Sequence, residues 1–108
     1  MADPLPVEDI KVNNIGKLTK TTEPMLNSIG IDVYNAECIL KILGYKKGNP
    51  DTHFDSDTLK AVKAYQKESG IEVTGKLDSR TQSALNRSRL EIIKKFDTQY
   101  IEAVKLLN

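Results

Sequence analysis

The sequence has few of the residues that carry chemistry in small proteins. Its 108 residues include one cysteine, one histidine and no tryptophan. A single cysteine excludes an intrachain disulfide and a four-cysteine zinc site, and a single histidine excludes a histidine-rich metal site. We therefore expect neither a metal nor a cofactor.

An excess of positive charge is also missing. Sixteen basic residues against 15 acidic ones give a formal charge of +1, whereas nucleic-acid binding needs clustered cations. Glu91 and Asp97 interrupt the basic residues near the C-terminus, so we expect a solvated helix face there rather than a nucleic-acid partner. The basic residues concerned are Arg87, Arg89, Lys94 and Lys95.

Long apolar runs are absent as well. No run approaches the roughly 20 residues of a membrane-spanning helix, so we expect no membrane contact from this segment. The opening Met1-Ala2-Asp3-Pro4 lacks the basic and apolar stretches of a secretory signal, and we expect no targeting signal here. The 39% hydrophobic and 29% charged residues are typical of a folded domain.

Apolar residues recur at helical spacing in four stretches. They predict helices over Val33–Leu43, about Ser56–Ser69 and about Ser79–Asn86, followed by a helical stripe over Leu90–Leu107. No strand pattern of comparable length is present. The sequence therefore predicts an all-α three-helix bundle.

The chain divides into three parts. Three of its four prolines lie in residues 1–30, which we expect to be a linker or edge segment outside the core. Residues 31–87 form the predicted domain. Residues 88–108 form the predicted C-terminal helical tail.

Two predicted helix starts share one pattern. Asp55 and Asp78 each follow an apolar residue, and Thr58 and Thr81 stand three positions after them. An aspartate before the first turn accepts hydrogen bonds from unpaired backbone N–H groups. We expect these aspartates to be N-caps, and Asp32 to cap the first helix in the same way.

Glycines mark the predicted helix ends. Gly44 and Gly70 each follow the last periodic residue and precede an apolar one, which is typical of a left-handed C-terminal cap. Gly75 indicates a turn between the second and third helices. Near the end of the second helix, we expect Gln66 to be a buried amide that bonds loop backbone groups.

Candidate catalytic and metal-binding residues have structural explanations. Cys38 falls beside the apolar stripe of the first helix, so we expect a small hydrophobe rather than a nucleophile paired with His53. The loop that begins at Asp51 resembles a calcium loop, but it has Ser56 where glycine is needed and Val62 where glutamate is needed. We expect a helix-capping turn, and a chain without catalytic activity of its own.

A series of motifs runs through half of the chain. In order, they are Leu43-Gly44-Tyr45, Asp51-Thr52, Phe54-Asp55, Thr58, Ala61-Val62-Lys63-Ala64-Tyr65-Gln66, Gly70-Ile71, Gly75 and Thr81 to Leu85. Together they resemble the three-helix type of bacterial peptidoglycan-binding domain. The chain departs from the family pattern at Thr52 and Asp55, which replace loop glycines, and at Glu37, which replaces a glutamine. We expect the fold to tolerate these changes.

The flanks carry two further patterns, one over residues 6–12 and one over residues 97–107. They resemble the strand after the catalytic core and the terminal helix of a second family, the bacterial C-terminal processing serine proteases. This resemblance implies a non-catalytic fragment of an extracytoplasmic protease, whose catalytic serine and lysine lie elsewhere. It names two partners: peptidoglycan or its stem peptides, and the catalytic domain of the parent protease.

The resemblance implies a ligand surface on the loops around five residues, namely Tyr45, His53, Phe54, Tyr65 and Gln66. An alternative function is an intramolecular protein-interaction module that positions substrate or regulates the protease. The apolar stripe of the tail, with Ile93, Phe96 and Tyr100, is the reason for this alternative.

Overall fold

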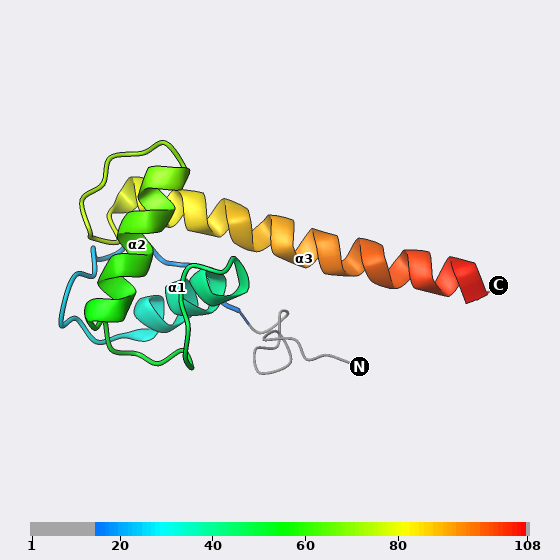
Figure 1. The fold of residues 1–108 in the computed structure, drawn as a ribbon, viewed down its shortest axis with the longest axis horizontal. Coiled ribbons are helices and arrows are strands. Elements are labelled where there is room, and N and C mark those ends of the chain that lie inside the picture. The colour runs from blue at the N-terminus through cyan, green and yellow to red at the C-terminus, as the bar shows by residue number, and fades with distance from the viewer. Residues whose placement is uncertain (1–14, 108) are drawn as a thin grey trace.

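Three helices make up the regular structure of the described residues. The computed structural model describes residues 15–107, and the side chains of residues 15–95. Helices α1 (Ile31–Ile42), α2 (Ser56–Glu68) and α3 (Ser79–Leu107) follow one another, and α1 contacts both of the others (Figure 1). In the described residues the pairing of extended backbone is limited to an isolated bridge between Ile29 and His53. The all-α prediction is confirmed.

The third helix and the tail are one continuous helix. The prediction that the third helix ends near Asn86 is wrong, because α3 runs on to Leu107. Residues 79–107 contain neither glycine nor proline, so nothing in the sequence interrupts the backbone hydrogen bonds. The helix gives the molecule its 49 Å long axis, against 23 Å in the other two directions (Figure 1).

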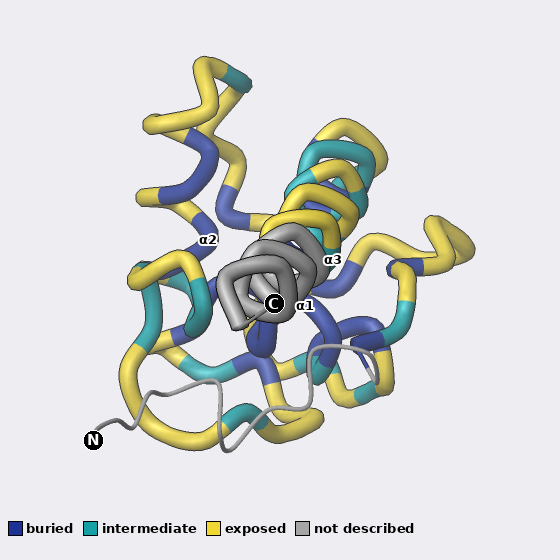
Figure 2. Tube along the Cα trace, turned by 90° about the vertical axis from the view of Figure 1, so that its right-hand side faces the viewer, coloured by how far each residue is buried: buried dark blue, intermediate teal, exposed yellow. Residues whose placement is uncertain are grey.

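The core lies where the helices meet. Buried stretches face the middle of the molecule in Figure 2. The fully buried apolar side chains include Phe54 and Leu77, the two residues that precede the caps of α2 and α3. Leu43, predicted as part of the α1 stripe, is instead 39% exposed at the helix end.

The segment before α1 contributes to the core, contrary to prediction. Ile15 and Leu18 are only 2% and 3% exposed and belong to the core cluster. Residues 15–24, here called the N-terminal strap, therefore cover apolar surface of the helices. Residues 6–12, predicted to be strand-like, lie outside the described residues, as do the side chains of Phe96 and Tyr100.

A row of polar side chains on α3 holds the strap. Asn86 accepts from Leu18 N at 2.8 Å through Oδ1 and donates to Leu18 O at 3.0 Å through Nδ2. Gln82 accepts from the backbone N of Lys20 at 2.9 Å. Arg89 donates through Nε to Ile15 O at 2.6 Å, so it is not the fully solvated residue that the sequence predicted. Each of these bonds gives a partner to a backbone N–H or C=O group of the strap that has none in a helix or sheet.

The predicted N-cap of α1 is wrong for a related reason. Gly30 occupies the N-cap position and no side chain caps it. Asp32 instead lies inside the first turn, where its two carboxylate oxygens accept from Thr19 N at 3.1 Å and Thr19 Oγ1 at 2.7 Å. The carboxylate of Asp32 therefore holds the strap and does not cap the helix.

The remaining predicted caps are confirmed. Asp55 Oδ1 accepts from Thr58 N and Asp78 Oδ1 accepts from Thr81 N, each at 2.9 Å. Gly44 has a φ of 93°, a left-handed conformation in which its N–H reaches Lys41 O at 3.0 Å. Tyr45 N then donates to Leu40 O at 2.8 Å, the second bond of a Schellman motif.

We predict that Asn86→Ala lowers the free energy of unfolding by about 1–3 kcal/mol, because both backbone groups of Leu18 lose their partner. Urea denaturation followed by circular dichroism measures the change. Arg87→Ala is the matched control, since the side chain of Arg87 is exposed. Equal stability of the two variants would contradict the role given to Asn86.

Candidate ligand-binding site

The loop between α1 and α2 is held by backbone pairing with residues 27–30. Asn27 N donates to Phe54 O at 2.8 Å, and Phe54 N donates to Ser28 O at 2.9 Å. His53 lies on this pairing with its side chain exposed. The loop thus has a fixed backbone course without forming a sheet.

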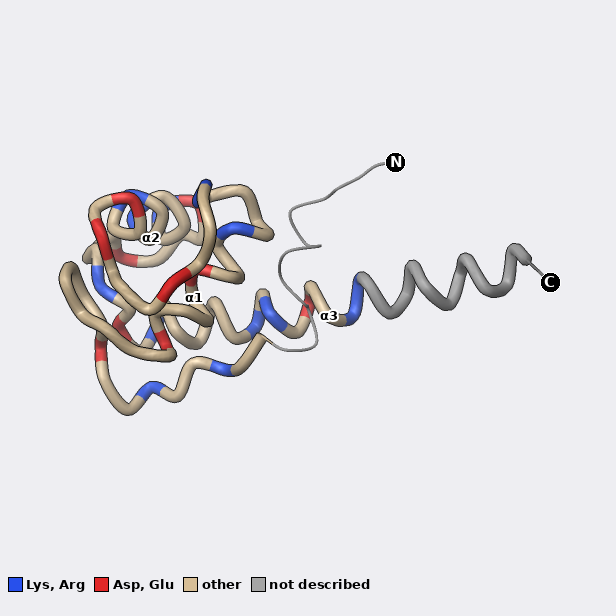
Figure 3. The backbone as a smooth tube through the Cα atoms, turned by 90° about the horizontal axis from the view of Figure 1, so that it is seen from below, with Lys and Arg blue, Asp and Glu red and all other residues tan. Residues whose placement is uncertain are grey.

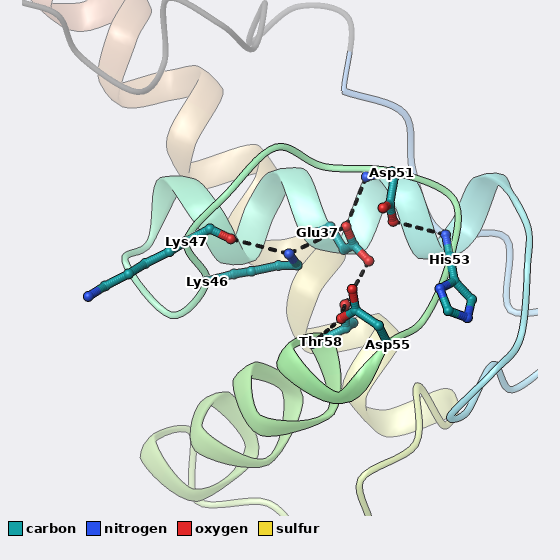
Figure 4. A network of polar contacts seen from close by, with 7 residues as sticks. All are labelled: Glu37, Lys46, Lys47, Asp51, His53, Asp55 and Thr58. Carbon is teal, nitrogen blue, oxygen red and sulfur yellow. Dashed lines mark hydrogen bonds and ion pairs between the residues drawn. The ribbon is translucent and has the colours of Figure 1, made fainter.

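A buried carboxylate holds the same loop from inside. Glu37 Oε1 accepts from Asp51 N at 2.9 Å, and Glu37 Oε2 accepts from Thr58 Oγ1 at 2.7 Å (Figure 4). Lys46 Nζ lies 3.8 Å from Glu37 Oε1. The side chain of Glu37 therefore joins α1 to the loop and to the first turn of α2.

Burial raises the pKa of Glu37 above its ordinary value of 4.5. The hydrogen bonds from Asp51 N and Thr58, and the charge of Lys46, act in the opposite direction but do not cancel the desolvation. Glu37, which stands where the resembled domains have a glutamine, therefore has a structural role. Its burial disfavours the charged form of the carboxylate.

A buried amide organises the loop between α2 and α3. Gln66 Nε2 donates to Thr81 Oγ1 at 2.8 Å and to Lys76 O at 3.0 Å. Its Oε1 accepts from Thr74 N and Gly75 N, each at 3.0 Å. The prediction that Gln66 satisfies loop backbone groups is confirmed.

Two tyrosines meet where α1 and α2 end. The rings of Tyr45 and Tyr65 have centroids 5.6 Å apart at an interplanar angle of 87°, an edge-to-face contact. The hydroxyl of Tyr65 lies 2.9 Å from Ser88 Oγ on α3. Tyr65 is 4% exposed and thus presents little more than an edge to solvent.

The structure does not bring the five predicted site residues to one surface. Phe54 and Gln66 are 0% exposed and are core residues, so their prediction as ligand contacts is wrong. Tyr45 is partly buried, and His53 is exposed on the α1–α2 loop. Tyr65 lines a groove between α2 and α3.

Two grooves flank the exposed side of α3. The first, here called the α2–α3 groove, has a volume of about 240 Å³. It is lined by Tyr65, Ser69, Ile71, Arg80, Ala84, Arg87, Ser88 and Glu91. The second, here called the strap groove, has a volume of about 690 Å³ and is lined by Lys17, Leu18, Thr19, Lys20, Ser83, Asn86, Arg87 and Leu90.

Sequence reasoning missed the contribution of α3 to these grooves. The signal that could have found it is the spacing of Arg80 and Arg87, seven residues apart and therefore on one helix face. Ala84 lies between them and leaves room above the helix. The sequence alone does not show that a groove runs along each side of this face.

The candidate nucleophile and the candidate base lie in different surroundings. Cys38 is 1% exposed in α1, and burial raises the pKa of its thiol, which disfavours the reactive thiolate. His53 is exposed on the α1–α2 loop.

The described part of the chain contains no group of three or more histidine, cysteine, aspartate or glutamate residues placed to hold a metal ion. None of the helices described there combines the length and apolar character needed to cross a membrane.

Residues 30–85 match a family model described as "Putative peptidoglycan binding domain". The chain belongs to this family. The match spans α1, α2 and the first turns of α3, and therefore includes the Glu37 and Gln66 networks. The resemblance that the sequence motifs indicated is confirmed.

Two proteases are similar to the chain, as its flanks predicted. The carboxy-terminal processing protease CtpB of Bacillus subtilis is 36% identical over 78 residues, which cover 70% of the chain and 16% of that protease. A CtpA-like serine protease of Staphylococcus saprophyticus is 35% identical over 69 residues, covering 64% of the chain and 14% of that protease. The chain thus spans a small part of these relatives.

A solved structure shares the fold. The crystal structure of a peptidoglycan-binding protein from Clostridioides difficile, in complex with glutamine hydroxamate, superposes with a TM-score of 0.61 at 31% identity. The superposed region covers 66% of this chain and 44% of that one.

We predict that replacing Glu37 by glutamine stabilises the domain progressively as pH rises. The raised pKa of Glu37 means that its contribution is most favourable below 4.5 and falls as pH rises through the folded-state value. In Glu37→Gln the amide oxygen can accept from Asp51 N and the amide nitrogen can donate to Thr58 Oγ1. Thr58 can then direct its own hydrogen to Asp55 Oδ1, 3.0 Å away.

Urea denaturation at several pH values measures the difference between Glu37→Gln and wild type, which should grow with pH. Glu37→Ala is the control without either acceptor, and it should be about 2–4 kcal/mol less stable at neutral pH. A difference between Glu37→Gln and wild type that shrinks with rising pH would overturn this account.

We predict that Gln66→Ala destabilises the domain by about 2–4 kcal/mol, because the half-buried N–H of Thr74 and the buried N–H of Gly75 lose their acceptor. The exposed neighbour Lys67 provides the matched control, Lys67→Ala. Thermal denaturation followed by circular dichroism compares the two variants. If Gln66→Ala and Lys67→Ala have the same melting temperature, the loop does not depend on the amide of Gln66.

Proposed function

We propose that the chain is a non-catalytic module that binds the peptidoglycan of the cell wall. Family membership over residues 30–85 is the observation that carries this proposal. The solved structure that shares the fold is titled as a peptidoglycan-binding protein, which supports the same function. Because peptidoglycan lies outside the cytoplasmic membrane, the module acts on the extracytoplasmic side.

The α2–α3 groove is the best place for a wall ligand among the described grooves. It offers the hydroxyls of Tyr65 and Ser88 beside two guanidinium groups, those of Arg80 and Arg87. Ala84 and Ile71 supply apolar wall between these polar groups. Such a mixture of few directed polar groups on an apolar lining is typical of ligand sites.

The parent protein of the module is a C-terminal processing serine protease. Similarity to two such proteases supports this, although the chain covers 16% and 14% of their lengths. In such a protein the module brings the protease to the wall, and the catalytic serine and lysine belong to another part of the molecule.

A second candidate function is docking on the catalytic domain of that protease. Ile29 and Ile31 are 76% and 62% exposed, and they line a groove of about 530 Å³ beside the strap. Exposed apolar side chains that line a groove favour contact with another protein. Such docking can position substrate or regulate cleavage, and it is compatible with wall binding through α3.

We predict that the full chain pellets saturably with purified peptidoglycan sacculi and is released by soluble muropeptides. Centrifugation at increasing chain concentrations measures the binding. Gln66→Ala, unfolded by heating before the assay, is the control for nonspecific pelleting. A folded wild-type chain that stays in the supernatant at every concentration would falsify wall binding.

The docking function is tested in the full-length protease. If Ile29 and Ile31 contact the catalytic domain, the double variant Ile29→Ser and Ile31→Ser should change the rate of peptide cleavage. Val73→Ser, at a residue that is 50% exposed on another loop, is the control. Unchanged cleavage in the double variant argues against docking and leaves wall binding unaffected.

A further inference from the structure

The exposed side of α3 carries two arginines in line. Arg80 and Arg87 are both exposed, and their seven-residue spacing places them about 10 Å apart along the helix axis. Ala84 stands between them. Two guanidinium groups are therefore presented along one face, with a small side chain between them.

Arg87 belongs to both grooves. It lines the α2–α3 groove together with Arg80, and it lines the strap groove together with Lys17 and Lys20. The described lining of the strap groove contains no carboxylate. The lining of the α2–α3 groove contains one acidic residue, Glu91. In Figure 3 basic positions lie on α3 and on the segment that runs beside it.

In the part of the chain that the structure describes, none of these cations forms an ion pair. Within the described residues the ion pair found is that of Lys46 with Glu37, in the α1–α2 loop network. Neither Arg80 nor Arg87 makes one there, and the Lys20 ammonium donates to an uncharged group, Ser83 Oγ, at 2.7 Å. In a chain with a formal charge of +1, this cluster is a local concentration of positive charge.

We propose that this face of α3 binds the carboxylate groups of peptidoglycan stem peptides. The proposal rests on the wall-binding function proposed above. A guanidinium presents N–H donors in a fixed fork that matches a carboxylate, and two forks in line fit a peptide that carries more than one acid group. Ala84 and Ile71 provide apolar contact for the peptide's methyl groups.

The glycan strand fits this face less well. Sugar rings bind mainly by stacking on exposed aromatic faces, and the aromatic residue that lines these grooves is Tyr65, which is 4% exposed. The edge of that ring and its hydroxyl, shared with Ser88, are better placed to accept or donate one hydrogen bond to a peptide group.

The test removes two charges from this face and compares it with removal of two charges elsewhere. Arg80→Gln with Arg87→Gln should weaken binding of the full chain to sacculi by about tenfold or more. The control variant, Lys47→Gln with Lys60→Gln, has the same net charge as the double arginine variant but changes two exposed positions that line neither groove. This control should bind sacculi as wild type does. Equal weakening of both double variants, or of neither, would overturn the proposal.

Soluble ligands identify the chemical group. A stem peptide with free carboxylates should bind wild type, and the same peptide with its carboxylates amidated should bind at least about tenfold more weakly. Binding that disappears when sacculi are stripped of phosphodiester-linked polymers would assign the face to phosphate and overturn the proposal.

If wild type binds sacculi but not the free-acid peptide, wall binding stands and the carboxylate assignment fails. If wild type binds neither, both fail.

Discussion

The buried amide of Gln66 is the interaction on which the candidate site depends. It joins the end of α2, the loop over residues 71–77 and the first turn of α3 through two donated and two accepted hydrogen bonds. Tyr65, its neighbour in sequence on α2, and Arg80 on α3 both line the α2–α3 groove. The buried side chain of Gln66 thus sets the distance between the groups that line the α2–α3 groove.

The same physical constraint explains the rest of the fold. In its described part the chain pairs little backbone outside its helices, so the strap and loops need side-chain partners for their buried N–H and C=O groups. Glu37 serves the α1–α2 loop, while Gln82 and Asn86 serve the strap. An unpaired group at each place would cost about 1–3 kcal/mol. This cost explains why the polar side chains of Glu37 and Gln82 are buried and why Asn86 faces the strap.

Local features could be predicted from the sequence, and long-range ones could not. The caps at Asp55 and Asp78 involve residues three positions apart, and the glycine at position 44 needs only the end of its own helix. The strap bonds Asn86 across 68 residues, and Asp32 leaves its expected capping role because of Thr19. The candidate site shows the same difference between local and long-range features. Motif residues such as Phe54 could be recognised from the sequence but belong to the core, whereas the grooves form only when α3 packs against the rest of the domain.

The central claim is that the exposed face of α3, positioned by the Gln66 network, holds the wall ligand. Backbone amide shifts of the isotope-labelled chain, titrated with a soluble stem peptide, test it most directly. The account predicts shifts that cluster over residues 80–91 and at Tyr65. Shifts confined to residues 44–55, with α3 unaffected, would contradict it.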